Sequence, residues 1–400
     1  MPHCALCGLI LAFDFKKEGF LKITDIKVHY IEIPFPRELR STWGHGRAEK
    51  VHGQSLVEVQ TDEGISGYGA AEAMWGWGAV HKAVIENMLK PRLLGKNPFA
   101  TEQHIMDIRD VPGRAWMVEN ALWDIIGKVA GMPIYKMWGG FQNRVQAYAA
   151  WAELRSPEEA AEHALHLVER GFKGAKLRLH HPKMADDLAL VEAVRKAVGD
   201  KLTIMVDANQ ATAPYRTGAL KTTALWSYER ALKMARALQE LDVYWLEEPL
   251  PLHDYRDLTR LAAEADILIA GGEINREIFE FKLFLDQECY DILQPNCTMA
   301  EGMFQVRKIA AMAEVNHKLC IPHAWVQGPG FYANLHVAGA VGNCPWIEFA
   351  YDPPVLTPEN FHSIITEPPK IDTEGYVPLP EKPGLGVEIN WDIVKRFTKQ

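Results

Sequence analysis

The stretch Leu202-Thr203-Ile204-Met205-Val206-Asp207 is a run of mostly apolar residues that ends in a carboxylate. Two later stretches repeat this pattern, Val243-Tyr244-Trp245-Leu246-Glu247 and Ile267-Leu268-Ile269-Ala270-Gly271-Gly272-Glu273. Short runs of this kind, separated by helical segments, are typical of βα units and a parallel sheet. We therefore predict three successive strands, each followed at its carboxyl end by an acid.

The same alternation of short apolar runs and helical segments extends over residues 141–350. The pattern predicts strands near 145–150, 173–179, 202–207, 242–247, 267–271, 290–294, 317–322 and 345–349. It predicts helices near 157–170, 184–198, 226–240, 254–265, 275–286, 301–315 and 329–340. Eight strands with this spacing match a barrel whose functional groups gather at the carboxyl ends of its strands.

The chain before residue 141 lacks this alternation and has a different pattern of apolar residues. Residues 21–72 are rich in β-formers, with a polar loop expected over Arg37–Gln54 and a hairpin turn at Asp62-Glu63-Gly64. Residues 80–131 carry apolar positions at three- and four-residue spacing, which predicts helices. We expect an α+β domain here and an extension over residues 1–19. The segment 351–400, rich in Pro and Gly, is expected to run back to this first domain.

The composition excludes some classes of function. The 400 residues carry a net charge of −9, which argues against nucleic acid as a partner. No apolar run is long enough for a membrane span, so we expect a cytoplasmic protein. The six cysteines are sparse, and four of them lie among apolar, barrel-like segments, which predicts buried free thiols in a reducing compartment. The other two form Cys4-x-x-Cys7, which lacks further ligands for zinc.

The three acids at the strand ends predict a metal site. Neighbouring strands of a barrel converge on one rim, where Asp207, Glu247 and Glu273 would repel one another unless a cation lay between them. Oxygen ligands with room for substrate and water are what Mg²⁺ prefers, so we expect one Mg²⁺ per chain. The alternative is that each acid caps the helix that follows it.

These motifs resemble those of the enolase superfamily, and most closely its mandelate racemase subgroup. The resemblance rests on Val206-Asp207-Ala208-Asn209-Gln210, Trp245-Leu246-Glu247-Glu248-Pro249 and Gly271-Gly272-Glu273, and it extends from about Leu21 to Pro383-Gly384-Leu385-Gly386-Val387. It implies a (β/α)7β modified TIM barrel with an N-terminal α+β capping domain. The expected boundaries are 20–140 for the cap, 141–350 for the barrel and 351–400 for the returning segment. The resemblance also implies that the first acid of Glu247-Glu248 is the metal ligand.

The second predicted barrel strand ends in Lys176-Leu177-Arg178, and alternation points both cations into the barrel mouth. Relatives of mandelate racemase carry a Lys-x-Lys motif here, whose first Lys neutralises the substrate carboxylate and whose second is a base. The second position of this chain is Arg178. Because arginine stays protonated, it is a poor base and a good electrostatic clamp. The alternative is a pair of solvated surface cations.

His323, at the end of the seventh predicted strand, matches the family's histidine base on the opposite face of the substrate. Histidine titrates near neutrality and can take and return a proton. The family pairs it with an Asp, whereas this chain has Asn296 at that position. An amide can orient the ring but cannot stabilise imidazolium as a carboxylate does, so we expect a weaker base.

Further substrate contacts follow from the resemblance. Glu348 matches an acid that hydrogen-bonds the substrate carboxylate, and Asn209 matches a substrate-binding amide. The polar loop over Ser41–Gln54 carries His45 and Arg47, which suit a polyhydroxylated or anionic distal end of the substrate. The alternatives are capping and packing for the first two, and an incidental exposed loop for the others.

Dehydration of an acid sugar needs one base on one face, whereas racemisation needs a competent base on each. With Arg178 on one face, we expect a lyase that removes the α-proton of a sugar-acid carboxylate and eliminates the β-hydroxyl to give a 2-keto-3-deoxy acid. The alternatives are a racemase, epimerase or cycloisomerase acting on a related acid or lactone, and a metal-binding protein that has lost catalysis. The resemblance also implies a homo-oligomer.

Overall fold

The computed structural model describes residues 21–399 except 45–46, 114 and 212–225. The expected extension, Cys4, Cys7 and His45 lie outside the described residues. The chain begins with an antiparallel sheet of β1 (Ile23–Leu39), β2 (Glu49–Thr61) and β3 (Ser66–Glu72). The prediction of a loop over Arg37–Gln54 was too broad, because β1 and β2 stay paired as far as Leu39 and Glu49. Pairing of backbone groups across the sheet outweighs the polar composition of these strand ends.

Helices cover one face of this sheet. They are α1 (Trp77–Val84), a π-helical turn (Ile85–Leu89), α2 (Lys90–Leu93), α3 (Thr101–Arg109) and α4 (Trp116–Ala130), followed by the short α5 (Ile134–Met137). Helix α4 lies directly on β3, where a Cβ at Gly69 would come within 1.9 Å of the Met117 carbonyl oxygen. Only glycine allows the backbone of the strand to approach the helix this closely.

Eight parallel strands form the second part of the fold. They are β4 (Arg144–Ala150), β5 (Gly174–Arg178), β6 (Thr203–Asp207), β7 (Val243–Glu247), β8 (Leu268–Gly271), β9 (Ile292–Leu293), β10 (Leu319–Cys320) and β11 (Trp346–Ala350). The strands pair in chain order from β4 to β10, and β11 pairs with the other edge of β4. The eight strands predicted from the sequence are these eight.

Seven helices in the described part of the chain connect these strands. They are α6 (Pro157–Glu169), α7 (Met184–Val198), α9 (Tyr228–Glu240), α10 (Tyr255–Glu264), α11 (Glu277–Asp286), α12 (Met303–Val315) and α13 (Pro329–Ala340). Several begin at residues that satisfy their first amides, such as Ser156, which forms a capping box with Glu159. Strand alternation places Tyr148, Met205 and Trp245 inside the barrel, where they belong to one buried apolar cluster.

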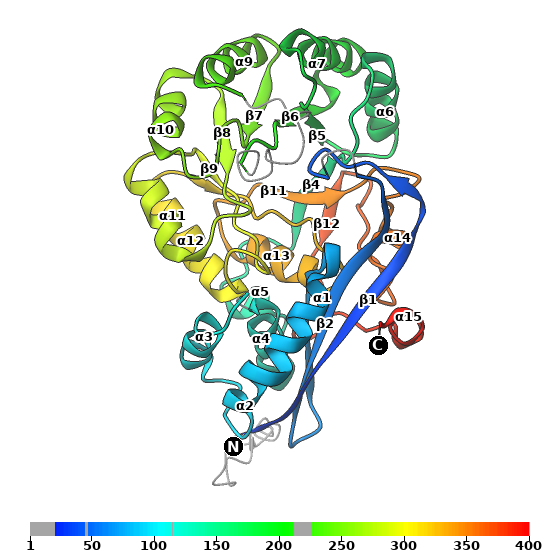
Figure 1. The fold of residues 1–400 in the computed structure, drawn as a ribbon, viewed down its shortest axis with the longest axis vertical. Coiled ribbons are helices and arrows are strands. Elements are labelled where there is room, and N and C mark those ends of the chain that lie inside the picture. The colour runs from blue at the N-terminus through cyan, green and yellow to red at the C-terminus, as the bar shows by residue number, and fades with distance from the viewer. Residues whose placement is uncertain (1–20, 45–46, 114, 212–225, 400) are drawn as a thin grey trace, which may run out of the picture.

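The last part of the chain ties the two parts together. After α14 (Pro358–Phe361), β12 (Tyr376–Pro378) pairs with β4, and α15 (Trp391–Phe397) packs on β1. Figure 1 shows α15 beside the long β1 strand, below the barrel. The fold is the predicted (β/α)7β barrel with an N-terminal α+β domain, while the domain boundaries stay predictions. None of the helices within the described ranges combines the length and apolar character needed to cross a bilayer.

Candidate active site

Strand register brings the predicted groups to one rim of the barrel. Arg178 at the end of β5 pairs with Asp207 at the end of β6, and Asp207 pairs with Glu247 at the end of β7. Lys176 lies two residues earlier on β5, so its side chain points to the same side of the strand as that of Arg178. All four side chains are buried.

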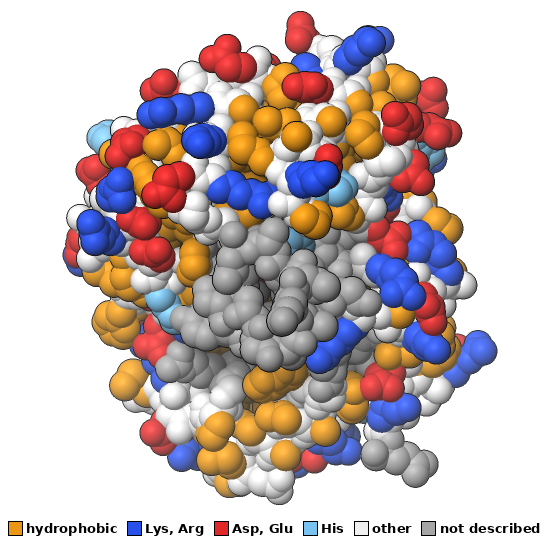
Figure 2. All heavy atoms as spheres, turned by 45° about the horizontal axis from the view of Figure 1, so that its top comes forward, with side chains coloured by type: hydrophobic (Ala, Val, Ile, Leu, Met, Phe, Trp, Pro, Cys, Tyr) orange, Lys and Arg blue, Asp and Glu red, His pale blue; other side chains and the backbone are white. Residues whose placement is uncertain are grey.

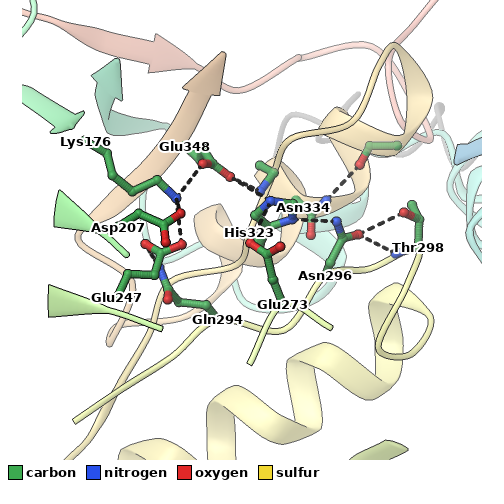
Figure 3. Close-up of polar contacts among 12 residues, drawn as sticks. Lys176, Asp207, Glu247, Glu273, Gln294, Asn296, Thr298, His323, Asn334 and Glu348 are labelled. Carbon is green, nitrogen blue, oxygen red and sulfur yellow. Dashed lines mark hydrogen bonds and ion pairs between the residues drawn. The ribbon is translucent and has the colours of Figure 1, made fainter. Parts of the chain in front are cut away.

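Lys176 lies among three carboxylates. Its Nζ is 2.7 Å from Glu247 Oε1, 2.9 Å from Glu348 Oε1 and 3.7 Å from Asp207 Oδ2. Figure 3 shows the ammonium group directed between these acids. Burial alone would lower the pKa of Lys176, but the surrounding negative charges raise it, with Glu247 contributing most. Lys176 is therefore a fixed positive charge.

Arg178 is held from several directions. Its Nε donates to the Trp151 carbonyl oxygen at 2.6 Å, and one terminal nitrogen contacts Asp207 Oδ2 and Asn209 Oδ1. Its guanidinium also lies over the ring of Trp43 at 4.8 Å from the centroid. A guanidinium held in this way is a clamp and cannot accept a proton.

His323 faces two acids with one ring nitrogen and an amide with the other. Its Nε2 is 3.2 Å from Glu273 Oε2 and 3.6 Å from Glu348 Oε2, while Nδ1 is 2.9 Å from Asn296 Nδ2. Figure 3 shows the ring between these partners. The structure thus brings together His323 and Asn296, which the sequence predicted as partners.

The orientation of the Asn296 amide is set by Thr298. Asn296 Oδ1 accepts hydrogen bonds from the Thr298 backbone N–H at 2.8 Å and from its hydroxyl at 2.9 Å. A backbone N–H can only donate, so a flipped amide would set two donors against each other. Nδ2 therefore donates to His323 Nδ1, and the hydrogen of the neutral ring is on Nε2, facing the carboxylates.

A small pocket of about 120 Å³ opens beside these groups. Its wall includes Arg178, Asn209, Glu273 and His323, all predicted site residues. It also includes Glu248, which the sequence analysis set aside in favour of Glu247. Glu248 is buried, its Oε1 has no hydrogen-bond partner, and its backbone has a positive φ of 46°. The signal that could have found it is the adjacent pair of acids, since one of them must leave the regular strand alternation to face the pocket.

The site carries more negative than positive charge. Among the described residues, the acids near the permanent cations Lys176 and Arg178 are Asp207, Glu247, Glu248, Glu273 and Glu348, and Glu72 also lines the pocket. Burial raises the pKa of Glu247 to about 8, helped by Asp207 and Glu348, in spite of Lys176. Burial and the charge of Glu273 raise the pKa of Glu248 well above its ordinary range. By contrast, although burial alone would raise the pKa of Glu348, the charge and hydrogen bond of Lys176 and the charge of Arg178 help lower it to about 2.

The donor chemistry of this site fits a hard divalent cation. Within the described ranges, however, no three acidic, His or Cys side chains are arranged to hold a metal ion. Asp207 and Glu247 contact Lys176, and Glu273 contacts His323. An all-oxygen set with surplus negative charge matches Mg²⁺, provided that these carboxylates rotate away from Lys176 and His323.

One predicted group from the loop after β1 does not line the pocket. Arg47 is exposed and is not among the described residues of the pocket wall. The other predicted group, His45, lies outside the described residues. Two neighbours in this loop do reach the site. Trp43 lines the pocket, and Thr42 donates a hydrogen bond to Asn209 Oδ1 at 2.7 Å.

Two family models match the chain. The enolase C-terminal domain-like model matches residues 159–393, and the N-terminal domain model of mandelate racemase and muconate lactonizing enzyme matches residues 47–139. Together they cover the barrel after β4 and most of the α+β domain.

Characterised relatives resemble the chain over most of its length. It is 32% identical to an arabinonate dehydratase of Saccharolobus solfataricus over 359 residues, which is 85% of this chain and 89% of the relative. It is 25% identical to a 3,6-anhydro-alpha-L-galactonate cycloisomerase of Streptomyces coelicolor, over 94% of this chain and 99% of the relative. The relatives therefore include both lyases and isomerases.

Solved structures show the same fold. A member of the enolase superfamily from Polaromonas sp. JS666 superimposes with a TM-score of 0.83 at 27% identity, covering 95% of this chain and 98% of that one. A racemase from Streptomyces coelicolor A3(2) with bound magnesium superimposes with a TM-score of 0.81 at 25% identity, covering 94% of this chain and all of that one. With two matching domain models and this agreement in fold, the chain belongs to the mandelate racemase subgroup of the enolase superfamily.

Proposed function

We propose that this chain is a Mg²⁺-dependent acid-sugar dehydratase. The observation that carries the proposal is the state of Arg178, which is bound to Trp151, Asp207 and Asn209 on a face where a racemase needs a base. Of the predicted site residues that the structure describes, His323 is the one we assign to proton transfer, and dehydration needs no second base. The substrate class is supported by the arabinonate dehydratase and D-xylonate dehydratase among the relatives.

The proposed metal ligands are Asp207, Glu247 and Glu273. Mg²⁺ bound there would stabilise the enediolate that forms when the α-proton of a carboxylate is removed. The surplus of acidic groups around Lys176 and Arg178 supports a cation at this place. Glu248 lies close enough to these acids that, besides burial, their charges raise its pKa.

Lys176 and Glu348 prepare the site for a substrate carboxylate. Lys176 is a permanent positive charge in a water-poor environment, where its attraction for a developing oxyanion is strong. Glu348 Oε2 accepts a hydrogen bond from the Ala324 backbone N–H at 2.9 Å, which fixes the acid beside His323. We assign Glu348 to contact with the substrate carboxylate and Asn209 to contact with a neighbouring substrate oxygen.

His323 is the proposed proton carrier. Its Nε2 takes the proton from the α-carbon and then gives it to the departing β-hydroxyl, which leaves as water, and the enol product ketonises to a 2-keto-3-deoxy acid. To accept a proton at Nε2, the neutral ring must first carry its hydrogen on Nδ1. The amide of Asn296 opposes that form because its Nδ2 is a donor. We therefore expect α-proton abstraction to be the slow step.

The test is an assay of the Mg²⁺-loaded protein against a library of aldonates and aldarates, scored for 2-keto product. A substrate that is turned over should show a primary isotope effect when its α-hydrogen is replaced by deuterium. The His323→Asn variant is the control and should form no product. Absence of product across the library, with bound metal measured by calorimetry, would overturn the proposal.

A cycloisomerase is the second candidate, because the cycloisomerase of Streptomyces coelicolor matches this chain over nearly its whole length. Such a reaction also needs an α-proton acceptor on one face only. Reaction in D₂O separates the two functions: a dehydratase yields a product that has lost one water, whereas an isomerase yields a product of unchanged composition that carries solvent deuterium.

A further inference from the structure

The loop that carries Asn296 joins β9 to α12 and is held by side chains from outside the loop. Both backbone groups of Cys297, the residue after Asn296, are held by hydrogen bonds. The Cys297 N–H donates to Asn334 Oδ1 of helix α13 at 3.0 Å. The carbonyl oxygen of Cys297 accepts from Asn120 Nδ2 of helix α4 at 2.9 Å. The barrel holds one side of this loop and the N-terminal domain holds the other.

Asn120 also holds the far end of the same loop. Its Oδ1 accepts the backbone N–H of Met303, the first residue of α12, at 2.9 Å. Asn120 is fully buried, so no water competes for these hydrogen bonds. One amide side chain of α4 thus spans the loop from Cys297 to Met303, using its donor at one end and its acceptor at the other.

Helix α4 and this loop are tightly packed against each other. A Cβ at Gly302 would lie 2.2 Å from Glu119 Oε2, so the loop backbone is pressed against the residue that precedes Asn120. Because close-packed elements transmit small shifts, a movement of Asn120 would also move the Cys297–Thr298 peptide, whose carbonyl oxygen it holds. The other end of that peptide is the Thr298 N–H, which donates to Asn296 Oδ1 and orients the amide toward His323 (Figure 3).

We propose that Asn120 is a positioning residue for His323. By spanning Cys297 and Met303 it fixes the loop in which Thr298 and Asn296 set the ring's orientation and the nitrogen that carries its hydrogen. The inference rests on the proposed function, because it takes His323 to be the proton carrier. It goes further in making proton transfer depend on how the N-terminal domain docks on the barrel, through a side chain remote from substrate.

Two variants of Asn120 distinguish its hydrogen bond to Cys297 from its hydrogen bond to Met303. Asn120→Ala removes both hydrogen bonds, whereas Asn120→Asp keeps an acceptor for Met303 and loses the donor to Cys297. The matched control is Asp124→Asn, a buried position one turn further along α4. Asp124 bonds instead to Tyr68, Lys128 and Leu385, away from the loop. All three changes disturb the same helix, but only the first two touch the loop that carries Asn296.

The first readout is ¹⁵N NMR of the imidazole nitrogens, with the His323 signals assigned by their loss in His323→Asn. We expect the Nδ1 and Nε2 signals of His323 to shift or broaden in both Asn120 variants and to stay unchanged in Asp124→Asn. The second readout is kinetic. We expect kcat to fall about tenfold or more in both Asn120 variants, with KM and Mg²⁺ affinity close to the wild-type values.

Two results would overturn the inference: His323 signals that do not respond to either Asn120 variant, or a loss of kcat that Asp124→Asn reproduces in full. Because the NMR measurement needs no substrate, it reports on the inference even if no acid sugar is dehydrated. Failure of the library assay with shifted His323 signals would contradict the proposed function alone.

Discussion

The guanidinium of Arg178 lies 4.8 Å from the centre of the Trp43 ring, so a cation of the barrel supports an aromatic residue of the loop that follows β1. Trp43 also packs edge-on against Trp325, with 4.9 Å between ring centres. These contacts place the loop at the pocket wall. They also show why an arginine at this position serves as a clamp. The guanidinium forms an ion pair with Asp207 and stacks its face on the Trp43 ring.

Replacing Trp43 by alanine should therefore weaken substrate binding more than it slows chemistry. A cation–π contact is worth about 0.5–2 kcal/mol, which corresponds to a rise in KM of roughly 2- to 30-fold with a smaller change in kcat. Phe99→Ala, at an exposed aromatic of the N-terminal domain, is the control. Steady-state kinetics measure both values, and an unchanged KM in Trp43→Ala would contradict the role given to the loop.

Arg178→Lys should slow dehydration and introduce exchange of the substrate α-proton with solvent. Lysine loses the planar fork that reaches Trp151, Asp207 and Asn209, so the clamp weakens and dehydration slows. Lysine can also lose its proton, which places a base on the second face of the substrate. We expect solvent deuterium at the α-carbon of recovered substrate in D₂O, detected by NMR. Arg178→Gln, which lacks both charge and base, should show no such exchange, and equal exchange in the two variants would refute this account.

Asn296→Asp should make His323 a better base. A carboxylate can accept from Thr298 and, with its other oxygen, from an Nδ1–H of the ring, which frees Nε2 to take a proton. It also stabilises imidazolium, so the acidic limb of the pH–rate profile should move to higher pH. We expect dehydration to speed up, by up to about tenfold, and the isotope effect to shrink. A slower variant with an unshifted profile would show that the amide is needed for another reason.

Most of the barrel could be predicted from the sequence because each strand is a short apolar run with a local signature. All eight strands were located, although β9 and β10 are only two residues long, since their apolar neighbours mark them as well. The extent of β1 and β2 could not be predicted. Their ends at Leu39 and Glu49 owe their structure to pairing across the sheet, which leaves no trace in local composition.

The candidate site likewise contains residues that could be predicted from the sequence and contacts that could not. Asp207, Glu247, Glu273 and His323 stand at strand ends, where a local pattern is enough to place them. The grip on Arg178 comes from the Trp151 carbonyl and from the Trp43 ring, which is 135 residues away in sequence. The hydrogen bond from Asn120 of α4 to the Cys297 carbonyl oxygen joins the N-terminal domain to the barrel. Such contacts depend on how helices, strands and loops pack together, and local sequence patterns do not predict that packing.

Lys176→Met should destabilise the metal-free protein strongly. Lys176 is the closest cation to Glu247 and Glu348, and its loss leaves buried carboxylates without compensation, at a cost of about 3–5 kcal/mol. If Glu247 and Asp207 bind Mg²⁺, saturating metal should restore part of the lost stability. Thermal unfolding with and without Mg²⁺ measures both effects. A loss of stability that Mg²⁺ does not reduce would count against metal binding by these two carboxylates.

Metal binding should release protons near neutral pH. The pKa of Glu247 is raised from 4.5 to about 8, so its stabilising contribution to the metal-free fold is complete below pH 4.5 and is lost as the pH rises through about 8. Mg²⁺ needs the carboxylate form, so below about pH 8 it must displace a proton, and its apparent affinity should rise with pH and level off above that value. The Mg²⁺-induced gain in Tm should follow the same course, because metal replaces the missing positive charge as the acids ionise.

Calorimetric titration at about pH 7 in two buffers of different ionisation enthalpy measures this release directly. We expect the observed binding enthalpies to differ by the proton count multiplied by the difference between the buffers. In Glu247→Gln both the release and the affinity should fall, whereas Glu153→Gln, at an ion pair with Arg37 on the cap side of the barrel rim, should match the wild type. Identical enthalpies in the two buffers, together with an affinity that does not change between about pH 6 and about pH 8, would mean that Glu247 gives up no proton to a metal.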